Sequence, residues 1–420
     1  MSPTPTLSRR ALFYTRNLPA VVLPCLAAAC AATGQEEAAE SDDTGTDGGD
    51  VPQVEAGYPP LAAPCRFPIA EPTRLAVTSS DGASGAVGLA DTVTRTVQTD
   101  LAAAQTDTSL AFFDDRLFVI NRLGFDYIDV LDLGNALALL AQFSVSTDPD
   151  ASSNPSSMVM SASGEAYVSL FGDDVLQVVD MSAPEGPTLA RTISLSHFAD
   201  DDGIPEMGLL IECGEVLFVA VERLDRNETW QPVDVTYLVP LRAAQDTLYD
   251  FDVSHEGADG VALLGAGAKE FRADPADDTG HRILLLSSGL ERVDLALGTS
   301  EWVIDAATFA AAGFGPFQLR SFDIGSDGMA YFVLAKGDWS QHMIYRASLD
   351  RGGMDLERMA GELQTITGDL EVIGMHAWFT DTTIGASGLR IFDLSTVPAT
   401  ELSNPPLPTG LPPYGLLPLP

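Results

Sequence analysis

The chain has 420 residues, 45% of them hydrophobic, with a mean hydropathy of +0.11. It can therefore bury a sizeable core, and wholesale disorder is excluded. A formal net charge of −38, from 60 acidic and 22 basic residues, repels nucleic acids and anionic lipid surfaces, so we expect no nucleic-acid partner.

The N-terminus has the order of a secretory leader. Arg9, Arg10 and Arg16 precede an apolar stretch over residues 18–29, which ends in small residues just before Cys30. A positive region, a short apolar region and small residues before a cleavage point are typical of a signal peptide. The apolar stretch is too short to cross a bilayer about 30 Å thick. We predict that residues 1–29 are a signal peptide.

Cys30 is the predicted lipid-attachment site. The alanines at 27–29 before it resemble a bacterial lipobox, although Leu26 lies four residues before the cysteine and the family pattern usually has it three before. Lipidation would make Cys30 the mature N-terminus and attach the protein to a membrane through this lipid only. Ordinary cleavage with a secreted product is the alternative. Residues 8–13 also resemble a twin-arginine export signal, so both export routes stay open.

Residues 30–71 are predicted to be an acidic, Pro-rich tether. Its carboxylates, mainly within residues 36–50, repel one another, and it has few apolar groups to bury. Cys65 lies at its end. Once the leader is removed and Cys30 is lipidated, Cys65 and Cys213 remain, and we expect them to form one disulfide in an oxidising compartment. Two unpaired buried cysteines are the alternative.

From residue 72 onward the pattern predicts an all-β domain. Short β-branched and aromatic runs alternate with Gly, Asp and Asn turns. The clearest unit covers residues 155–195 and has four strands. Its two central strands, the second of which ends in aspartate, recur along the chain, with copies at 75–78 and 85–91, 117–121 and 127–132, 217–222 and 236–241, 282–287 and 290–294, 330–334 and 343–350, and 377–380 and 389–393.

The repeat spacing predicts a seven-bladed β-propeller over residues 72–420. The closing residues Asp91, Asp132 and Asp180 lie 41 and 48 residues apart, which fits four-stranded blades. Stacking such sheets in a ring covers their faces and leaves only short edges. The first repeat lacks an innermost strand, and residues 413–418 supply a spare one. We predict that this C-terminal strand completes the first blade and closes the ring.

Residues 166–180, AYVSLFGDDVLQVVD, resemble the YVTN-type propeller repeat. The other units match only in their hydrophobic pattern and, in most cases, the closing aspartate. The resemblance implies a seven-bladed fold and a location outside the cytoplasm, in the periplasm or on the cell surface. It carries over no catalytic residue, because the repeat motif is structural.

No motif for catalysis or for a cofactor stands out. The five histidines are scattered, without the paired spacing that a zinc site needs. One acidic loop concentrates oxygen ligands of the kind that Ca²⁺ prefers, namely Asp200, Asp201, Asp202 and Glu206. This loop predicts calcium as a cofactor, and solvated turns without a bound ion are the alternative.

The leading interpretation of function is a cell-envelope module that binds or scaffolds protein or envelope polymer, because a propeller offers a rigid face of loops. Four tryptophans are candidate anchors, and a core role is the alternative for each: Trp230, Trp302, Trp339 and Trp378. The alternative function is a metal-assisted hydrolase of the lactonase or phytase kind, suggested by analogy of fold.

Overall fold

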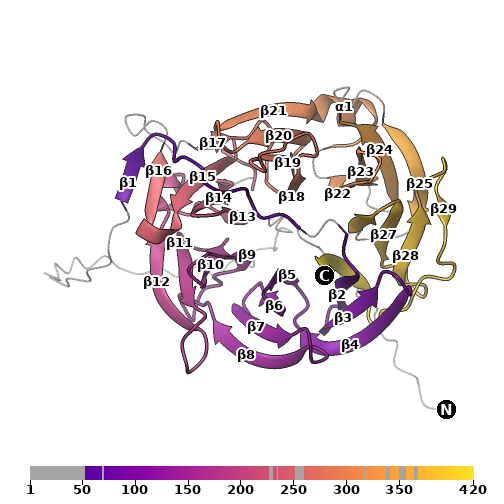
Figure 1. Ribbon diagram of the computed structural model, residues 1–420, viewed down its shortest axis with the longest axis horizontal. Coiled ribbons are helices and arrows are strands. Elements are labelled where there is room, and N and C mark those ends of the chain that lie inside the picture. Colours follow the sequence, from indigo (N-terminus) through magenta and orange to yellow (C-terminus); the bar gives the residue numbers. More distant parts are fainter. Residues whose placement is uncertain are drawn as a thin grey trace, which may run out of the picture.

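Seven β-sheets are arranged around a central axis in the computed structural model (Figure 1). The structure describes residues 53–420 except 69–70, 227–229, 234, 251–259, 316–317, 337–340, 350–355 and 364–367, as well as the side chain of residue 362. The predicted all-β, seven-bladed propeller is confirmed. The leader, Cys30 and Trp339 lie outside the described residues.

Blades 1 to 3 each have four strands in antiparallel order. Blade 1 contains β30 (Pro413–Leu419), β2 (Arg74–Ser80), β3 (Gly85–Asp91) and β4 (Thr96–Ala104), from the axis outward. Blade 2 contains β5 (Thr108–Phe113), β6 (Arg116–Asn121), β7 (Tyr127–Asp132) and β8 (Ala138–Ser144). Blade 3 contains β9 (Pro155–Met160), β10 (Glu165–Leu170), β11 (Val175–Asp180) and β12 (Thr188–Ser194), followed by the 3-10 turn η1 (Ser196–Phe198).

Blade 4 is the most elaborate sheet. It contains β13 (Met207–Cys213), β14 (Val216–Val221), β15 (Tyr237–Arg242) and β16 (Thr247–Asp250), with the 3-10 turn η2 (Ala243–Gln245) between the last two. Two further strands join it: β1 (Gln53–Ala56) runs parallel to β16, and β17 (Val261–Ala262) pairs with β15.

Blades 5 to 7 return to four strands. Blade 5 contains β18 (Glu270–Ala273), β19 (Arg282–Leu286), β20 (Leu290–Asp294) and β21 (Thr299–Ile304), and the short helix α1 (Ala306–Ala311) follows it. Blade 6 contains β22 (Leu319–Ile324), β23 (Met329–Ala335), β24 (His342–Ser348) and β25 (Glu357–Leu363). Blade 7 contains β26 (Leu370–Ile373), β27 (His376–Asp381), β28 (Gly388–Asp393) and β29 (Thr400–Glu401).

The C-terminal strand is the innermost strand of blade 1. β30 pairs antiparallel with β2, from Arg74 opposite Leu419 to Ser79 opposite Pro413. The two ends of the propeller chain therefore share one sheet, as the spare strand at 413–418 predicted. Without β30, the edge of β2 would be unpaired on the channel side.

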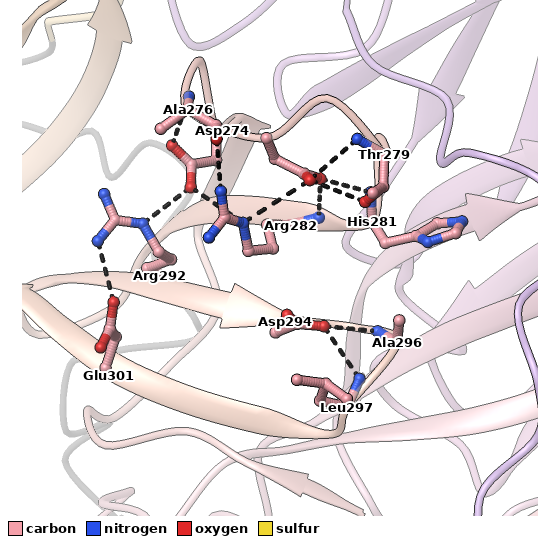
Figure 2. Close-up of polar contacts among 11 residues, drawn as sticks. Asp274, Ala276, Thr279, His281, Arg282, Arg292, Asp294, Ala296, Leu297 and Glu301 are labelled. Carbon is pink, nitrogen blue, oxygen red and sulfur yellow. Dashed lines mark hydrogen bonds and ion pairs between the residues drawn. The ribbon is translucent and has the colours of Figure 1, made fainter.

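The aspartate that ends the second central strand of the repeat shapes the turn that follows it. Figure 2 shows Asp294, at the end of β20, accepting hydrogen bonds from the backbone N–H groups of Ala296 (3.0 Å) and Leu297 (2.9 Å). Asp180 does the same with Ser182 (2.8 Å), and Asp393 with Ser395 (2.9 Å). These are Asx turns, in which a short carboxylate satisfies the backbone at a tight corner. The recurring aspartate is therefore a structural signal.

The folded part of the chain begins before residue 72. β1 extends the outer edge of blade 4, and residues 57–68, which we call the strap, then cross that blade toward the middle of the ring (Figure 1). Cys65 and Cys213 form a disulfide with an S–S distance of 2.00 Å. Since the end of β13 holds the strap in this way, part of the predicted tether belongs to the propeller.

The core lies between neighbouring blades. The central strands are buried on both faces, and β14 is buried at all six positions. Bulky side chains fill the gaps between sheets, and Tyr167, Phe218, Phe332 and Trp378 are at most 1% exposed. Among the described residues, no helix is both long and apolar enough to cross a membrane.

Candidate functional site

A channel runs along the axis between the innermost strands. It contains two adjacent hollows of about 320 Å³ and 260 Å³, both lined by Ser109, Ser157, Leu209, Lys269 and Glu270. Ligand sites are generally concave and few in number, so this channel is the candidate functional site.

The smaller hollow lies where the innermost strands begin. Five ionisable residues line it, and Glu270 is one of them, next to Lys269 on blade 5. We call this end of the channel the charged mouth and define it by the four that lie on different blades: Arg122, Glu222, Lys269 and Arg320. Arg122 directly follows β6, Glu222 directly follows β14, and Lys269 directly precedes β18. Three cations therefore gather at one end of the axis in a protein whose net charge is −38.

Burial shifts the pKa of two groups at the charged mouth toward neutrality. The Glu222 carboxyl is buried, which raises its pKa to about 7, and the nearby Glu206 carboxyl acts in the same direction. Burial lowers the pKa of the Lys269 ammonium to about 7, and Arg320 lowers it further. The two groups also attract each other when both are charged. This attraction lowers the pKa of Glu222 and raises that of Lys269, and so opposes the effect of burial on both. Shifted pairs of this kind are typical of functional sites.

The larger hollow contains a buried arginine with two carboxylate partners. The Arg272 guanidinium pairs with Asp323 Oδ1 (2.8 Å) through Nε and with Glu371 Oε1 (3.1 Å) through Nη2. Burial opposes the charge of Arg272, but the two carboxylates outweigh it and raise the pKa of Arg272. Burial also raises the pKa of Glu371 well above its ordinary value. The three residues connect the innermost strands of blades 5, 6 and 7.

Hydroxyl groups link the innermost strands of blades 1 to 4. The Thr108 N–H donates to Tyr414 Oη (3.0 Å) between blades 2 and 1. Ser109 Oγ donates to the Ser156 carbonyl (3.0 Å) between blades 2 and 3. Between blades 3 and 4 the link comes from the second strand of blade 3, where Ser169 Oγ on β10 donates to the Gly208 carbonyl (2.7 Å) of the innermost strand β13. We call these three junctions the hydroxyl half of the ring.

Carboxylates link the remaining junctions, from blade 4 through blade 7 and back to blade 1, which we call the charged half. Glu222 accepts a hydrogen bond from the Ala268 backbone. Each later acceptor takes a backbone N–H of the next innermost strand: Glu270 from Phe322 (3.2 Å), Asp323 from Val372 (2.7 Å) and Asp369 from Leu416 (2.7 Å). The ionisable groups of the channel are therefore built into the blade-to-blade contacts.

The residues predicted to hold calcium do not form one ligand group. Among the described residues, no group of three or more His, Cys, Asp or Glu side chains is arranged to hold a metal ion. The buried Glu206 instead pairs with Arg226 Nε (2.5 Å) and accepts from the Leu224 N–H (2.7 Å). Asp200 and Asp202 accept the backbone N–H groups of the same loop. The local acidic pattern reflects these turn and ion-pair contacts.

The candidate tryptophan anchors do not form one surface. Trp378 is 1% exposed and lies in the core, whereas Trp230 stacks under Arg226 at 5.7 Å and Trp302 lies half-buried in β21. The described histidines are also dispersed. His197 pairs with Asp250 (2.7 Å), and His281 Nε2 lies 2.9 Å from the Ala63 carbonyl oxygen.

Reasoning from sequence missed the charged mouth. Arg122, Glu222, Lys269 and Arg320 belong to no local motif, since nearly 200 residues separate the first from the last. One signal was present: Lys269 is one of two lysines in the chain, and a lysine is unusual in so acidic a sequence.

Solved structures of similar fold include propellers that are described as lactonases. A periplasmic gluconolactonase of Pseudomonas aeruginosa matches with a TM-score of 0.54 and 16% identity, over 83% of this chain and 99% of that one. Two proteins described as candidate 6-phosphogluconolactonases have similar TM-scores. The protein from Bacteroides fragilis has a TM-score of 0.55 and 13% identity over 83% and 97% of the chains, and that from Bacteroides uniformis 0.53 and 12% over 83% and 99%.

No protein-family model matches the chain, and no curated protein matches it. The structure shows the seven-bladed architecture, while the finer YVTN assignment stays a prediction. The leading interpretation, a binding or scaffold module, is wrong by these comparisons, because three of the similar structures are described as lactonases. They favour the alternative, a hydrolase.

Proposed function

We propose that the protein hydrolyses a lactone at the charged mouth of its central channel. The observation that carries the proposal is the meeting of Glu222 and Lys269, both with a pKa near 7, in a hollow lined by Arg122 and Arg320. A general base works best when its pKa lies near the working pH. The similarity of fold to gluconolactonase propellers supports the reaction class.

The proposed reaction adds water to the lactone carbonyl. The Glu222 carboxylate removes a proton from water, whose oxygen bonds to the carbonyl carbon. The negative charge that develops on the carbonyl oxygen lies near the cations of the charged mouth, which stabilise it. The ring C–O bond then breaks, and the departing alkoxide takes the proton from Glu222. One lactone and one water give one hydroxy acid, and Glu222 regains its charge.

The proposed reaction has no metal step, although the hydrolase suggested by analogy of fold was metal-assisted. The described residues do not offer a group of three donors that would fit a metal ion. Arg122 and Lys269 already supply positive charge at the site. Their role here is electrostatic: they attract and orient an electron-rich carbonyl.

The test is ring opening of glucono-1,5-lactone and its 6-phosphate by the full chain, measured against the uncatalysed rate. We expect Glu222→Gln to lower kcat by about 10²- to 10⁴-fold, the usual contribution of a general base. Ser169→Ala, in the hydroxyl half but outside the lining of both channel hollows, is the matched control and keeps most of the activity. No hydrolysis of either lactone by the unmodified protein, or full activity of Glu222→Gln, would reject the proposal.

We infer further that the protein is exported and attached to a membrane through a lipid on Cys30. The order of the leader supports export, as does the Cys65–Cys213 disulfide, because disulfides persist in oxidising compartments. One protein of similar fold is described as periplasmic. Cys30→Ser should move the protein from the membrane fraction to the soluble fraction, and an unchanged membrane fraction would reject the lipid.

A further inference from the structure

The strap reaches the channel at the end opposite the charged mouth. Arg66, Phe67 and Pro68 line the larger hollow, and none of them lines the hollow of the charged mouth. Residues near the ends of innermost strands, such as Phe113 on β5 and Glu212 on β13, line the hollow beside them. The strap is therefore part of the channel wall, although it comes from outside the blade repeats.

Three blades hold this part of the strap in place. The Arg66 backbone N–H donates to the Glu212 carbonyl (2.7 Å), and Arg66 Nε pairs with Glu212 Oε2 (3.0 Å) on blade 4. The guanidinium also lies over the Phe113 ring of blade 2, at 5.6 Å from its centre. The Phe67 ring lies 6.3 Å from the Phe271 ring of blade 5. Contacts to blades 2, 4 and 5 fix the segment across the end of the channel.

The contacts before Phe67 prevent the strap from swinging away. The disulfide joins Cys65 to the end of β13, and the Cys65 N–H donates to the Gly280 carbonyl (2.8 Å). His281 contacts the strap at Ala63. Figure 2 shows His281 beside the network of Asp274, Arg282 and Arg292, which stiffens this corner of blade 5. The strap is therefore anchored to two blades within four residues of Phe67.

A third hollow, of about 280 Å³, which we call the outer hollow, shares Phe67 and Pro68 with the larger channel hollow. It is lined by these two residues together with Pro72, Gly325 and Gly374, among others. Arg272, Glu371, Phe67 and Pro68 line both this outer hollow and the larger channel hollow. Phe67 and Pro68 thus belong to the walls of two cavities that share the same charged residues.

We propose that Phe67, held by the clamped strap, is the end wall of the channel and sets the length of ligand that the site accepts. The wall leaves a hollow of about 320 Å³, near the lower limit of typical ligand pockets, which suits a single sugar-sized lactone. Removing the phenyl ring joins this hollow to the outer one. The identity of the ligand rests on the proposed function, whereas the existence of the wall does not.

The first test of the wall is cysteine labelling of the full chain, which requires no measurement of enzyme activity. Val159→Cys places a thiol in the larger hollow, and Ser156→Cys places one in the smaller hollow only. A bulky maleimide is added, and the label is located by peptide mass spectrometry. With the wall intact we expect Ser156→Cys to react at least about tenfold faster than Val159→Cys, which corresponds to about 1.4 kcal/mol in access.

Phe67→Ala should raise the labelling rate of Val159→Cys toward that of Ser156→Cys. The matched control is Leu61→Ala, which removes strap packing outside both hollows and should leave the rate unchanged. Circular dichroism verifies folding, and Phe67→Leu is the milder variant if the alanine variant unfolds. Equal rates with the wall intact, or no change on opening it, would overturn the proposal.

A second arm uses lactones that carry alkyl chains of increasing length. We expect Phe67→Ala to extend hydrolysis to longer chains while kcat/KM for the shortest lactone stays within a fewfold of the unmodified protein. Unchanged chain-length preference in a labelled, opened channel would overturn the role in specificity. Absence of hydrolysis with every lactone would reject the proposed function, and the labelling result would still decide on the wall.

Discussion

The two halves of the ring solve the same packing problem with different chemistry. In the hydroxyl half, neutral groups such as Ser109 and Tyr414 join neighbouring innermost strands. In the charged half, carboxylates such as Asp323 and Asp369 take the equivalent place and accept backbone N–H groups from the next blade. Both arrangements satisfy backbone groups at the blade junctions: the carboxylates accept N–H groups, and the hydroxyls mostly donate to carbonyls.

The two halves of the ring differ in how their links respond to pH. A hydroxyl link does not titrate near neutral pH, so the hydroxyl half keeps its geometry over a wide pH range. The charged half contains Glu222, Lys269 and Glu371, whose pKa values are all displaced by burial. Buried charges are costly unless paired, and this cost is concentrated on the side of the channel where we propose that catalysis occurs.

The largest effect is expected where the halves meet. β30 bonds to the hydroxyl half through Tyr414 and to the charged half through the Leu416 N–H. Deleting residues 411–420 removes the innermost strand of blade 1 and both links, so we expect loss of cooperative unfolding, measured by calorimetry. Tyr414→Phe, which removes one link only, is the control and should cost about 1 kcal/mol. An unchanged melting temperature after the deletion would show that the seam is unimportant.

Within the charged half, the largest single effect is expected at Arg272. Arg272→Ala leaves Asp323 and Glu371 buried without their counter-ion, which typically costs about 3 to 5 kcal/mol in the free energy of unfolding. Urea unfolding measures this loss. The double variant Arg272→Met and Glu371→Leu should recover part of this loss, because only Asp323 is then left without its counter-ion. A loss below about 1 kcal/mol would contradict the importance of this ion pair.

The pH dependence should differ between the halves. The folded-state pKa of Glu222 is about 7, against an ordinary value of 4.5, so the folded protein holds this proton more tightly than the unfolded chain does. Its contribution to stability is fully present below pH 4.5 and is lost as the pH rises to 7. At about 1.4 kcal/mol per pKa unit, the loss is up to about 3 kcal/mol.

Glu222→Gln should remove this decline, so the free energy of unfolding of the variant should fall less between pH 4.5 and 7 than that of the unmodified protein. Chemical unfolding at several pH values measures the difference. Ser109→Ala should give a curve parallel to that of the unmodified protein. Parallel curves for Glu222→Gln as well would contradict the raised pKa.

The smallest effect is expected for a single hydroxyl link. Ser109→Ala removes the donor to the Ser156 carbonyl, which should cost about 1 kcal/mol. The loss should be independent of pH, because neither partner titrates. Chemical unfolding at pH 5 and pH 8 measures the size of the loss and its dependence on pH. A pH-dependent loss would mean that the hydroxyl half is coupled to the charged half.

Much of the architecture could be predicted from local patterns. The strands β7, β11 and β20 match the predicted 127–132, 175–180 and 290–294, because strand formation follows from alternation and tight turns within a few residues. The Cys65–Cys213 pair followed from counting the remaining cysteines. The aspartates at 200–202 show the limit of such patterns: local acidity predicts a ligand loop, while in the structure Asp200 and Asp202 accept nearby backbone N–H groups, and calcium there stays a prediction.

The sequence by itself determined the repeated four-stranded unit, its turns and the ring that such units must form to cover their faces. Only the tertiary structure decided the site. Arg122, Glu222, Lys269 and Arg320 meet because the innermost strands of different blades converge on one axis. The shifted pKa values arise from burial in that assembled channel. Burial and proximity depend on the whole ring, so no window of the sequence contains them.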